Sequence, residues 1–195
     1  MSDQGIPADW KPSDLEFRFT SGRVCLDMLA TVGSRSLAAI DRWRDGADLA
    51  RWCVDAGLLD KAPAVSGADL EAAREVREAL YRLVQARREA RLPERDDVDL
   101  LNAWAARPPP APQLGPDGRS KHMVLDGALD AALAAVAHDA VDLLAGPQID
   151  KVRECAEETC SILFVDASRP GKRRWCSMNR CGNKVKKAAF RGRNR

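Results

Sequence analysis

Four of the six cysteines fall in two pairs near the carboxyl end, and these pairs constrain the fold more than any other feature of the chain. Four residues separate Cys155 from Cys160, four separate Cys176 from Cys181, and fifteen lie between the pairs. Two short loops that each offer two thiolates satisfy the tetrahedral geometry of zinc held by four protein ligands. The spacing therefore predicts a structural Zn²⁺ site that is closed to a catalytic water.

Two other interpretations of the cysteine pairs compete with structural zinc. A disulfide framework needs an oxidising compartment, but the start MSDQGIPADWKPSD has neither the basic residues nor the apolar run of a secretory signal. No stretch reaches the roughly 18 apolar residues of a membrane span. We therefore expect a cytoplasmic protein with reduced thiols and no membrane partner. A redox-responsive zinc–thiolate cluster is the alternative that stays open.

The first 147 residues are predicted to form a mainly helical domain. Apolar side chains recur at helical spacing in the longer segments, and Ser66 with Asp69 gives one of them a capping-box-like start. Leu129, Leu133 and Val136 are expected to face inward on the last helix of this domain. The expected helices cover residues 46–59, 66–92, 95–106 and 125–147, and residues 23–32 are a buried helix or strand, of which the helix is favoured.

Short strands are expected beside these helices. Alternating Phe17 and Phe19 predict a strand over 17–22, and the turn sequence Pro-Asp-Gly predicts a hairpin with arms near 112–114 and 120–124. The fold class that follows is α+β, with a mainly helical domain that contains small strand elements and precedes a small zinc-bound unit.

Residues 148–195 are predicted to form this second unit, a zinc-bound β-hairpin followed by a helix. The spacer between the cysteine pairs is interpreted as strands 162–166 and 173–176 joined by a turn, which would bring the four sulfurs together. A helix is expected from Asn179 onward, with Cys181 in its first turn. The domain boundary therefore lies between residues 147 and 148.

Charge is distributed unevenly along the chain. Residues 151–195 carry 13 Lys and Arg against 4 Asp and Glu, although the net charge of the whole chain is only +2. On the expected helix, Val185, Ala188 and Ala189 would face the zinc and basic side chains would line the opposite side. Such a helix suits a DNA groove, where phosphates supply affinity and base edges supply specificity. The candidate nucleic-acid contacts are Arg169, Lys172, Arg173, Arg174, Arg180, Lys184, Lys187 and Arg191.

The sequence RECAEETCSILFVDASRPGKRRWCSMNRCGNK, residues 153–184, resembles the CGNR zinc finger. The shared elements are the first cysteine pair, a Phe-x-Asp-x-Ser-Arg segment from Phe164, an Arg-Trp-Cys-Ser segment from Arg174, and Cys-Gly-Asn from Cys181. Lys184 stands where the family has Arg, which keeps the charge but not the bidentate hydrogen bonding of a guanidinium. The resemblance implies that the four paired cysteines are the metal ligands.

The amino-terminal part is similar to the ABATE domain that accompanies this finger. The matching runs are SGRVCLDMLATV and DLARWCVDAGLL, and Ala30-Thr31 stands where the family has Asn-Thr. Together the two resemblances imply a bacterial, stress-associated transcription regulator. In such a protein the helical domain would sense a small-molecule effector or mediate a homodimer, and the finger would bind DNA.

Other functions receive less support from the residues. We find no phosphate-binding glycine loop, nucleophile elbow or paired-histidine motif, so we expect no enzymatic activity. Cys25 and Cys53 lie among apolar neighbours and are expected in the core, and His138 is expected on a solvated helix face. The alternative function is a protein-interaction module in which zinc is a purely structural clip and the basic helix holds an acidic partner.

Overall fold

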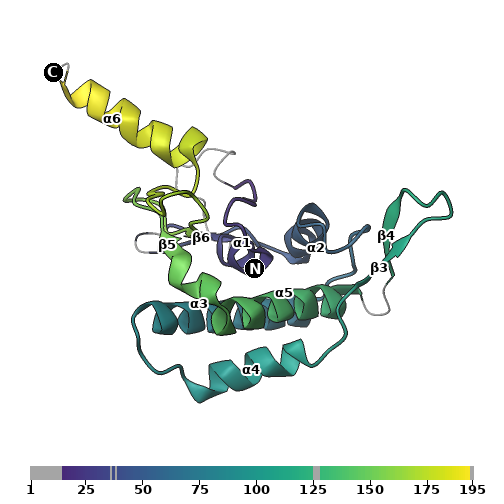
Figure 1. Ribbon diagram of the computed structural model, residues 1–195. Coiled ribbons are helices and arrows are strands. Elements are labelled where there is room, and N and C mark those ends of the chain that lie inside the picture. Colours follow the sequence, from purple (N-terminus) through teal and green to yellow (C-terminus); the bar gives the residue numbers. More distant parts are fainter. Residues whose placement is uncertain (1–14, 36, 38, 125–127, 194–195) are drawn as a thin grey trace.

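A computed structural model describes residues 15–35, 37, 39–124 and 128–193 of the chain. Its helices are α1 (Val24–Leu29), α2 (Gly46–Asp55), α3 (Gly67–Arg88), α4 (Arg95–Ala105), α5 (Ala128–Ala145) and α6 (Asn183–Arg193). Figure 1 shows α3 and α5 side by side, with α4 on one side of them and α1 and α2 on the other. Helix α6 stands apart from this body. Within the described ranges, none of the helices has the length and apolar character that crossing a bilayer demands.

Helix α3 begins where local chemistry predicts it. Ser66 Oγ accepts a hydrogen bond from the Asp69 N–H at 3.2 Å, and Asp69 Oδ2 accepts one from the Ser66 N–H at 2.9 Å. This reciprocal capping box satisfies two N–H groups that a helix start otherwise leaves unpaired. The helix ends at Arg88, four residues before the predicted end, and Ala90 follows in the left-handed region with φ of +53°.

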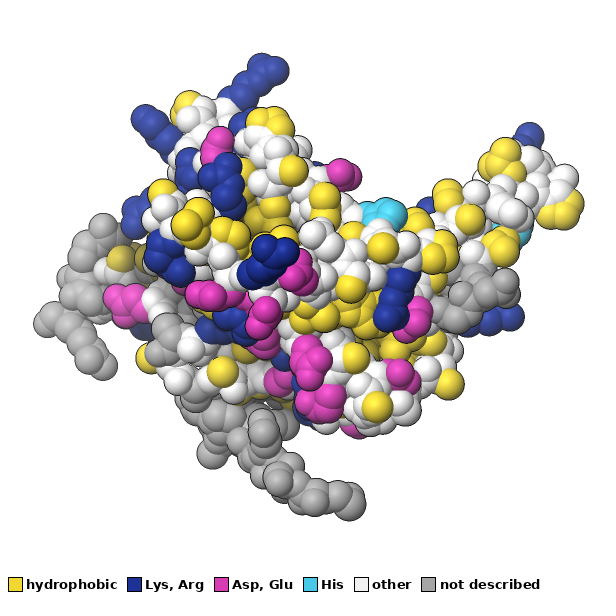
Figure 2. Space-filling view, turned by 90° about the horizontal axis from the view of Figure 1, so that it is seen from below, with side chains coloured by type: hydrophobic (Ala, Val, Ile, Leu, Met, Phe, Trp, Pro, Cys, Tyr) yellow, Lys and Arg dark blue, Asp and Glu magenta, His cyan; other side chains and the backbone are white. Residues whose placement is uncertain are grey.

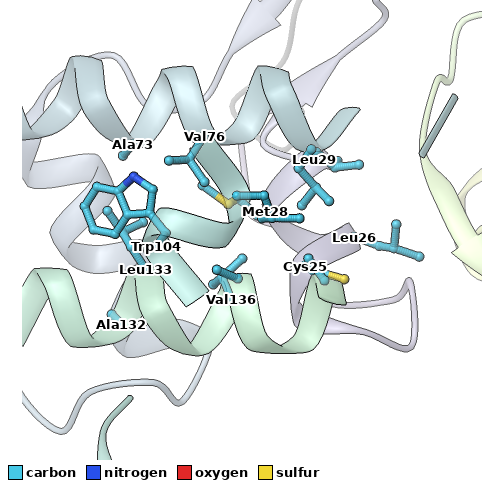
Figure 3. Close-up of a cluster of buried hydrophobic side chains, with 14 of the residues drawn as sticks. Cys25, Leu26, Met28, Leu29, Ala73, Val76, Trp104, Ala132, Leu133 and Val136 are labelled. Carbon is cyan, nitrogen blue, oxygen red and sulfur yellow. The ribbon is translucent and has the colours of Figure 1, made fainter. Parts of the chain in front are cut away.

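The main hydrophobic core lies between α1, α3, α4 and α5, and Figure 3 shows the side chains that converge there. Leu133 and Val136 of α5 are buried in it as predicted, and Cys25 and Cys53 are fully buried. Trp43 and Trp52, also fully buried, meet edge to face with ring centroids 5.4 Å apart. Edge-to-face contacts of this kind add stability beyond the area they bury.

Helix α5 ends at a glycine that the backbone requires. A Cβ atom added to Gly146 would lie 2.5 Å from the carbonyl oxygen of Asp142, which is too close for any other residue. The chain then continues into the 3₁₀ turn η2 (Pro147–Lys151), where proline occupies the first position.

The predicted hairpin after α4 is present, as β3 (Ala111–Leu114) antiparallel to β4 (Lys121–Val124). It projects from the body at the end opposite α6 (Figure 1). A second short pair, β1 (Val32–Gly33) with β2 (Ile40–Asp41), follows α1.

The predicted strand over 17–22 is wrong. The segment forms no ladder with any described residue, and its aromatic side chains pack on α2 instead. The Phe19 ring lies 6.4 Å from the Trp52 ring, and the Arg51 guanidinium lies 4.5 Å above the Phe17 ring. The alternation of the two aromatic residues therefore reflects the side of the segment that packs on α2, and it does not indicate a strand here.

The cysteine region, residues 148–193, contains a strand pair with a different partner from the one predicted. Strand β6 (Leu163–Val165) pairs antiparallel with β5 (Val152–Glu154), and residues 173–176 form no strand. The predicted pairing of 162–166 with 173–176 is therefore wrong, because the ladder spans the first cysteine pair and not the spacer. The π-helical turn η3 (Met178–Gly182) then leads into α6.

The cysteine region and the helical region, residues 15–147, share apolar packing. Val152, Leu163 and Val165 belong to the main core, while Ala30 of the helical region packs in a second cluster with three of the cysteines. The backbone joins them as well, because the Val165 N–H donates to the Ser21 carbonyl at 2.8 Å. The overall architecture is the expected one, with a helical part followed by a small strand pair and a terminal helix at the cysteines.

Candidate metal centre and basic helix

The structure brings Cys155, Cys160, Cys176 and Cys181 together at one point. Their four sulfurs lie within 4.8 Å of one another, and none of the cysteines is in a disulfide. The Sγ–Sγ distance is 3.8 Å from Cys160 to Cys176 and 3.6 Å from Cys176 to Cys181. Four sulfurs about 2.3 Å from a tetrahedral ion are separated by about 3.8 Å, so the arrangement fits zinc and is too open for disulfides.

Backbone hydrogen bonds and a helical turn hold the cysteines in place. The Cys160 N–H donates to the Glu157 carbonyl at 2.8 Å, which closes the first cysteine loop, residues 155–160, into a turn. The Cys176 N–H donates to the sulfur of Cys155 at 3.4 Å, which ties the second pair to the first. Cys181 is held in η3, the turn that carries the chain into α6.

The four sulfurs also shift the acidity of one another. Hydrogen bonds from the Cys160, Cys176 and Cys181 side chains hold the pKa of the Cys155 thiol well below its ordinary value. The same sulfur–sulfur interactions raise the pKa of Cys176, because its proton is shared with the anionic neighbour. A bound divalent cation replaces these protons and converts coordinating sulfurs to thiolates.

The loop after β6 is organised by Asp166. Its carboxylate accepts from the N–H and hydroxyl of Ser168 at 3.0 and 2.6 Å and from the Arg173 N–H at 2.9 Å. These hydrogen bonds lower the pKa of Asp166, the one from the Ser168 hydroxyl most strongly. The carboxylate thereby folds the basic turn back toward the cysteines.

Arg173, predicted as a nucleic-acid contact, lies inside this loop. Its Nε donates to the Trp175 carbonyl at 2.9 Å, its terminal nitrogen donates to the Cys176 carbonyl, and its guanidinium stacks over Phe164 at 4.4 Å. Three of its neighbours in the prediction, Arg169, Lys172 and Arg174, are exposed along the same turn. Arg173 therefore stabilises the loop by hydrogen bonds, whereas the other three basic residues face solvent.

Lys184 is held by the first cysteine loop. Its Nζ lies 3.0 Å from Glu157 Oε1 and donates to Thr159 Oγ1 at 2.7 Å. Burial alone would raise the pKa of Glu157, but hydrogen bonds from Thr159 and Lys184 outweigh burial and lower it. Sequence reasoning missed Glu157 as the partner of Lys184, because its burial shows only in the structure and the two residues lie far apart in the chain.

Arg180 also has an internal partner, since its guanidinium lies 3.6 Å from Glu16. The two predicted contacts nearest the cysteines, Arg180 and Lys184, therefore connect the start of α6 to other parts of the molecule. Lys187 and Arg191, one and two turns further along, are exposed.

The predicted orientation of α6 is wrong beyond its first turn. Val185 is half-buried, but Ala188 and Ala189 are exposed, so the small residues do not face the cysteine cluster. Figure 1 shows the reason, because the helix points away from the body and only its first turn meets another element. The described part of α6 beyond Val185 is therefore open to solvent on all sides, with Lys186, Lys187 and Arg191 exposed.

The helical region contributes to the metal centre through Ser34 and Arg35, which follow β1, and the sequence did not reveal this contribution. Ser34 Oγ donates to the Thr159 carbonyl at 2.6 Å, and the Arg35 N–H donates to Ser161 Oγ at 2.9 Å. Arg35 in turn forms a bidentate ion pair with Glu78 of α3, at 2.6 and 3.1 Å. The first cysteine loop is thus connected to the longest helix through Arg35.

Comparison with known proteins matches the two parts of the chain to two family models. The model described as "ABATE: Putative stress-induced transcription regulator" matches residues 22–147, and the model of the CGNR zinc finger matches residues 151–194. No curated protein matches the chain.

Proposed function

The chain belongs to the ABATE family and carries a CGNR zinc finger at its carboxyl end, and from this we propose that it is a DNA-binding transcription regulator. In this proposal Zn²⁺ bound by Cys155, Cys160, Cys176 and Cys181 is structural, and α6 contacts DNA. The helical region regulates that contact and catalyses no reaction. We place the protein in the bacterial cytoplasm, where a tetrathiolate site stays reduced.

The observation that carries the proposal is a basic helix that projects from a metal centre. The cluster, the η3 turn and the Lys184–Glu157 pair hold the first turn of α6, and the rest of the helix stands free (Figure 1). Lys186, Lys187 and Arg191 are exposed on this free part. A helix about 10–12 Å in diameter enters a major groove about 12 Å wide.

Exposed cations on the preceding turn extend this surface. Arg169, Lys172 and Arg174 lie on the segment that joins β6 to the second cysteine pair. Because Asp166 accepts hydrogen bonds from Ser168 and Arg173 on this segment and folds it toward the cysteines, the three exposed cations would contact phosphates beside a groove occupied by α6. Arg173, Arg180 and Lys184 are assigned a supporting role, since each already has a partner within the protein.

The test is duplex DNA binding by fluorescence anisotropy as the salt concentration rises. We expect a linear fall of log K with log salt, with a slope of about −0.9 for each phosphate neutralised. The triple variant Lys186→Gln, Lys187→Gln, Arg191→Gln is expected to bind more weakly and with a shallower slope. A wild-type affinity that does not change with salt would contradict the proposal.

A matched control removes the same number of charges elsewhere. Arg119 and Lys121 are exposed on the β3–β4 hairpin, at the end of the molecule opposite α6, and exposed Lys61 follows Asp60, whose carboxylate accepts from the Met123 N–H of β4 at 2.6 Å. The triple change of Lys61, Arg119 and Lys121 to Gln is expected to leave the salt slope unchanged. If the α6 variant instead kept its DNA affinity and lost an acidic protein partner in a pull-down, the interaction-module function would replace the regulator.

A small-molecule effector would bind most readily in a groove of the helical region, between α3, α4 and α5. Its volume is about 280 Å³, and Leu83, Ala86 and Leu101 form part of its apolar lining. Arg87 and Arg91 also line it and are exposed; Arg87 lies 3.9 Å from Asp150 and Arg91 lies 2.6 Å from Glu89, so a bound anion would compete with these acids. Figure 2 views the side that carries α4, where hydrophobic side chains lie among charged ones. This combination favours a small amphiphilic anion.

Effector binding is tested by thermal unfolding with octanoate as the probe. A ligand that binds only the folded state raises the unfolding midpoint. We expect such a rise for the wild type and a smaller one for Arg87→Gln, Arg91→Gln, with no rise for octanol, which lacks the charge. Light scattering of the same samples tests the proposed homodimer, and an unchanged midpoint with octanoate would remove this groove as the effector site.

A further inference from the structure

Phe190 is exposed on the free part of α6, and no function described above uses it. Its side chain is 59% exposed, the largest exposure among the described aromatic residues. Most other exposed apolar side chains of the described residues lie on loops and on the hairpin. Val141 of α5 and Met178 of η3 are also exposed, but to a smaller extent than Phe190, which lies on a helix that carries several cations. An aromatic ring left in water on a projecting helix indicates a surface that a partner covers.

Helical spacing places the ring on the same face as basic residues. Phe190 follows Lys187 by three residues and Lys186 by four, so the three side chains are neighbours on the helix surface. Phenylalanine in a helix points back toward the preceding turn, which brings the ring over these two lysines. Ala188 and Val185 lie on the opposite side. The free helix therefore presents one face that combines positive charge with one aromatic ring.

The charge on this face selects among the partners that could cover the ring. No acidic residue follows Asp166 in the chain, so the free part of α6 is flanked only by neutral and basic residues. A polyanion is the complementary partner for such a face. Among the groups that a DNA major groove presents, the C5-methyl of thymine is the apolar one.

We propose that Phe190 is a base-contacting residue that packs against a thymine methyl group in the major groove, while Lys186 and Lys187 hold the flanking phosphates. This inference rests on the DNA-binding function proposed above and adds the base class that α6 recognises. The lysines supply affinity for any sequence, and the ring supplies preference among sequences. An apolar contact with a methyl group releases no counterions, so it contributes affinity that does not depend on salt.

The experiment uses the full chain with its metal, and duplexes recovered from a random-sequence library by selection on the wild-type protein. Each recovered duplex is compared with a copy in which uracil replaces thymine, which removes only the methyl group. We expect the wild type to bind the uracil copy several-fold more weakly. Phe190→Ala is expected to bind the thymine duplex about tenfold more weakly than the wild type, with an unchanged salt slope.

The double comparison isolates the contact. Phe190→Ala should bind the thymine and uracil duplexes equally, because the methyl group has lost its partner. Phe190→Leu, which keeps apolar bulk, should retain part of the discrimination. Leu92→Ala removes another exposed apolar side chain, 90% exposed, and should change nothing. Since Phe190 lies outside both hydrophobic clusters, its replacement leaves folding intact.

Four results would overturn the inference, and the last would also overturn the DNA-binding function. The first is equal discrimination between thymine and uracil by wild type and Phe190→Ala. The second is salt-dependent DNA binding with no enriched sequence, which rejects base contact by Phe190 and leaves the DNA-binding function standing. The third is a blue shift of Phe190→Trp fluorescence on anionic phosphatidylglycerol vesicles but not on duplex DNA, which would assign the face to a lipid surface. Failure of the wild type to bind any duplex at low salt would reject both proposals.

Discussion

The helical region and the cysteine region are held together by different forces. The helical region supplies most of a large core in which Trp43, Trp52 and Leu133 are almost fully buried. The cysteine region contributes only five buried residues to the second cluster, three of them cysteines, and it is further held by hydrogen bonds to Asp166. So small a cluster cannot offset the entropy of ordering the chain, and we expect a metal ion at the four sulfurs to supply the difference.

The same contrast exists within the cysteine region, between the β5–β6 pair and the segment that follows it. Leu163 and Val165 of β6 are buried in the main core, so the β5–β6 pair is stabilised by the helical region. The segment from Ser168 to the end of α6 places no described residue in the main core, and it meets the helical region only through smaller contacts such as Ala30 beside the sulfurs and the Arg180–Glu16 ion pair. The contrast predicts that the metal controls the second half of the region far more than the first.

Metal removal is expected to give the largest effect. Structural zinc contributes about 10–16 kcal/mol to the folding of isolated finger peptides, so its loss should unfold the segment after Ser168. Hydrogen exchange after treatment with a chelator should show fast exchange from Cys176 to α6, with α3 and α5 still protected. Full protection around Cys176 without metal would contradict the division between the regions.

Replacement of one ligand tests the same division without a chelator. Cys176→Ser should lower the metal content below one ion per chain. Cys53→Ala, a change at a buried cysteine of the helical region, should leave the metal content unchanged and lower the unfolding temperature.

Leu133→Ala is expected to give the next largest effect, now in the other region. Leu133 is 1% exposed, and removal of a buried leucine side chain costs about 2–5 kcal/mol. Urea unfolding should show this loss while the metal content stays constant. Leu92→Ala, at a side chain that is 90% exposed, is the control and should change stability by less than about 0.5 kcal/mol. Loss of metal from Leu133→Ala would show that the two regions unfold together.

Asp27→Asn tests a buried charge in the helical region. Burial raises the pKa of Asp27 from 3.8 to about 6, although its Oδ1 accepts a hydrogen bond from the Ser21 N–H. The nearby Asp139 carboxylate also raises it. A raised acid pKa means that the folded state binds the proton more tightly than the unfolded state. Its stabilising contribution is therefore present below about pH 4 and is lost as the pH rises through about 6.

The variant should consequently equal the wild type at low pH and exceed it above pH 6. The difference is at most about 3 kcal/mol for a shift of this size. Because metal release at low pH affects both proteins, the difference between their unfolding free energies is the quantity to measure. A variant less stable than the wild type at pH 7 would show that the carboxylate charge is needed by its neighbours.

Lys184→Gln is expected to give the smallest change in stability. The Lys184 side chain is 58% exposed, and ion pairs this accessible contribute less than about 1 kcal/mol. The expected readout is local, namely faster hydrogen exchange in the first turn of α6 with an unchanged unfolding midpoint. Lys184→Arg should restore slow exchange, since a guanidinium can also reach Glu157. Equal exchange in all three proteins would remove Lys184 as the residue that orients α6.

The elements that were predicted correctly are those whose signals are local. The Ser66–Asp69 capping box and the Pro-Asp-Gly turn each lie within a few residues, and the structure contains both features. The cysteine cluster was also predictable, because pair spacing limits the geometry that the loops can adopt.

The errors concern contacts between distant residues. Strand β5 has the sequence Val-Arg-Glu, and its two charged residues give no strand signal, so its pairing with β6 was not predicted. The inward face predicted for α6 assumed a neighbouring element that is absent among the described residues. Likewise, the contact between Ser34 and Thr159 joins residues 125 positions apart, which no local pattern reveals. Base contact by α6 depends on a partner and stays a prediction.

The shared packing described above limits how this protein can be rebuilt. The main core contains Val152, Leu163 and Val165, and Ala30 packs beside the sulfurs. A cut near residue 147 would therefore expose apolar surface on both fragments. We therefore expect the finger not to fold when it is transferred alone to another protein. Chimeras that exchange the finger between relatives should fold only when the segment from Ala30 to Arg35 is exchanged with it.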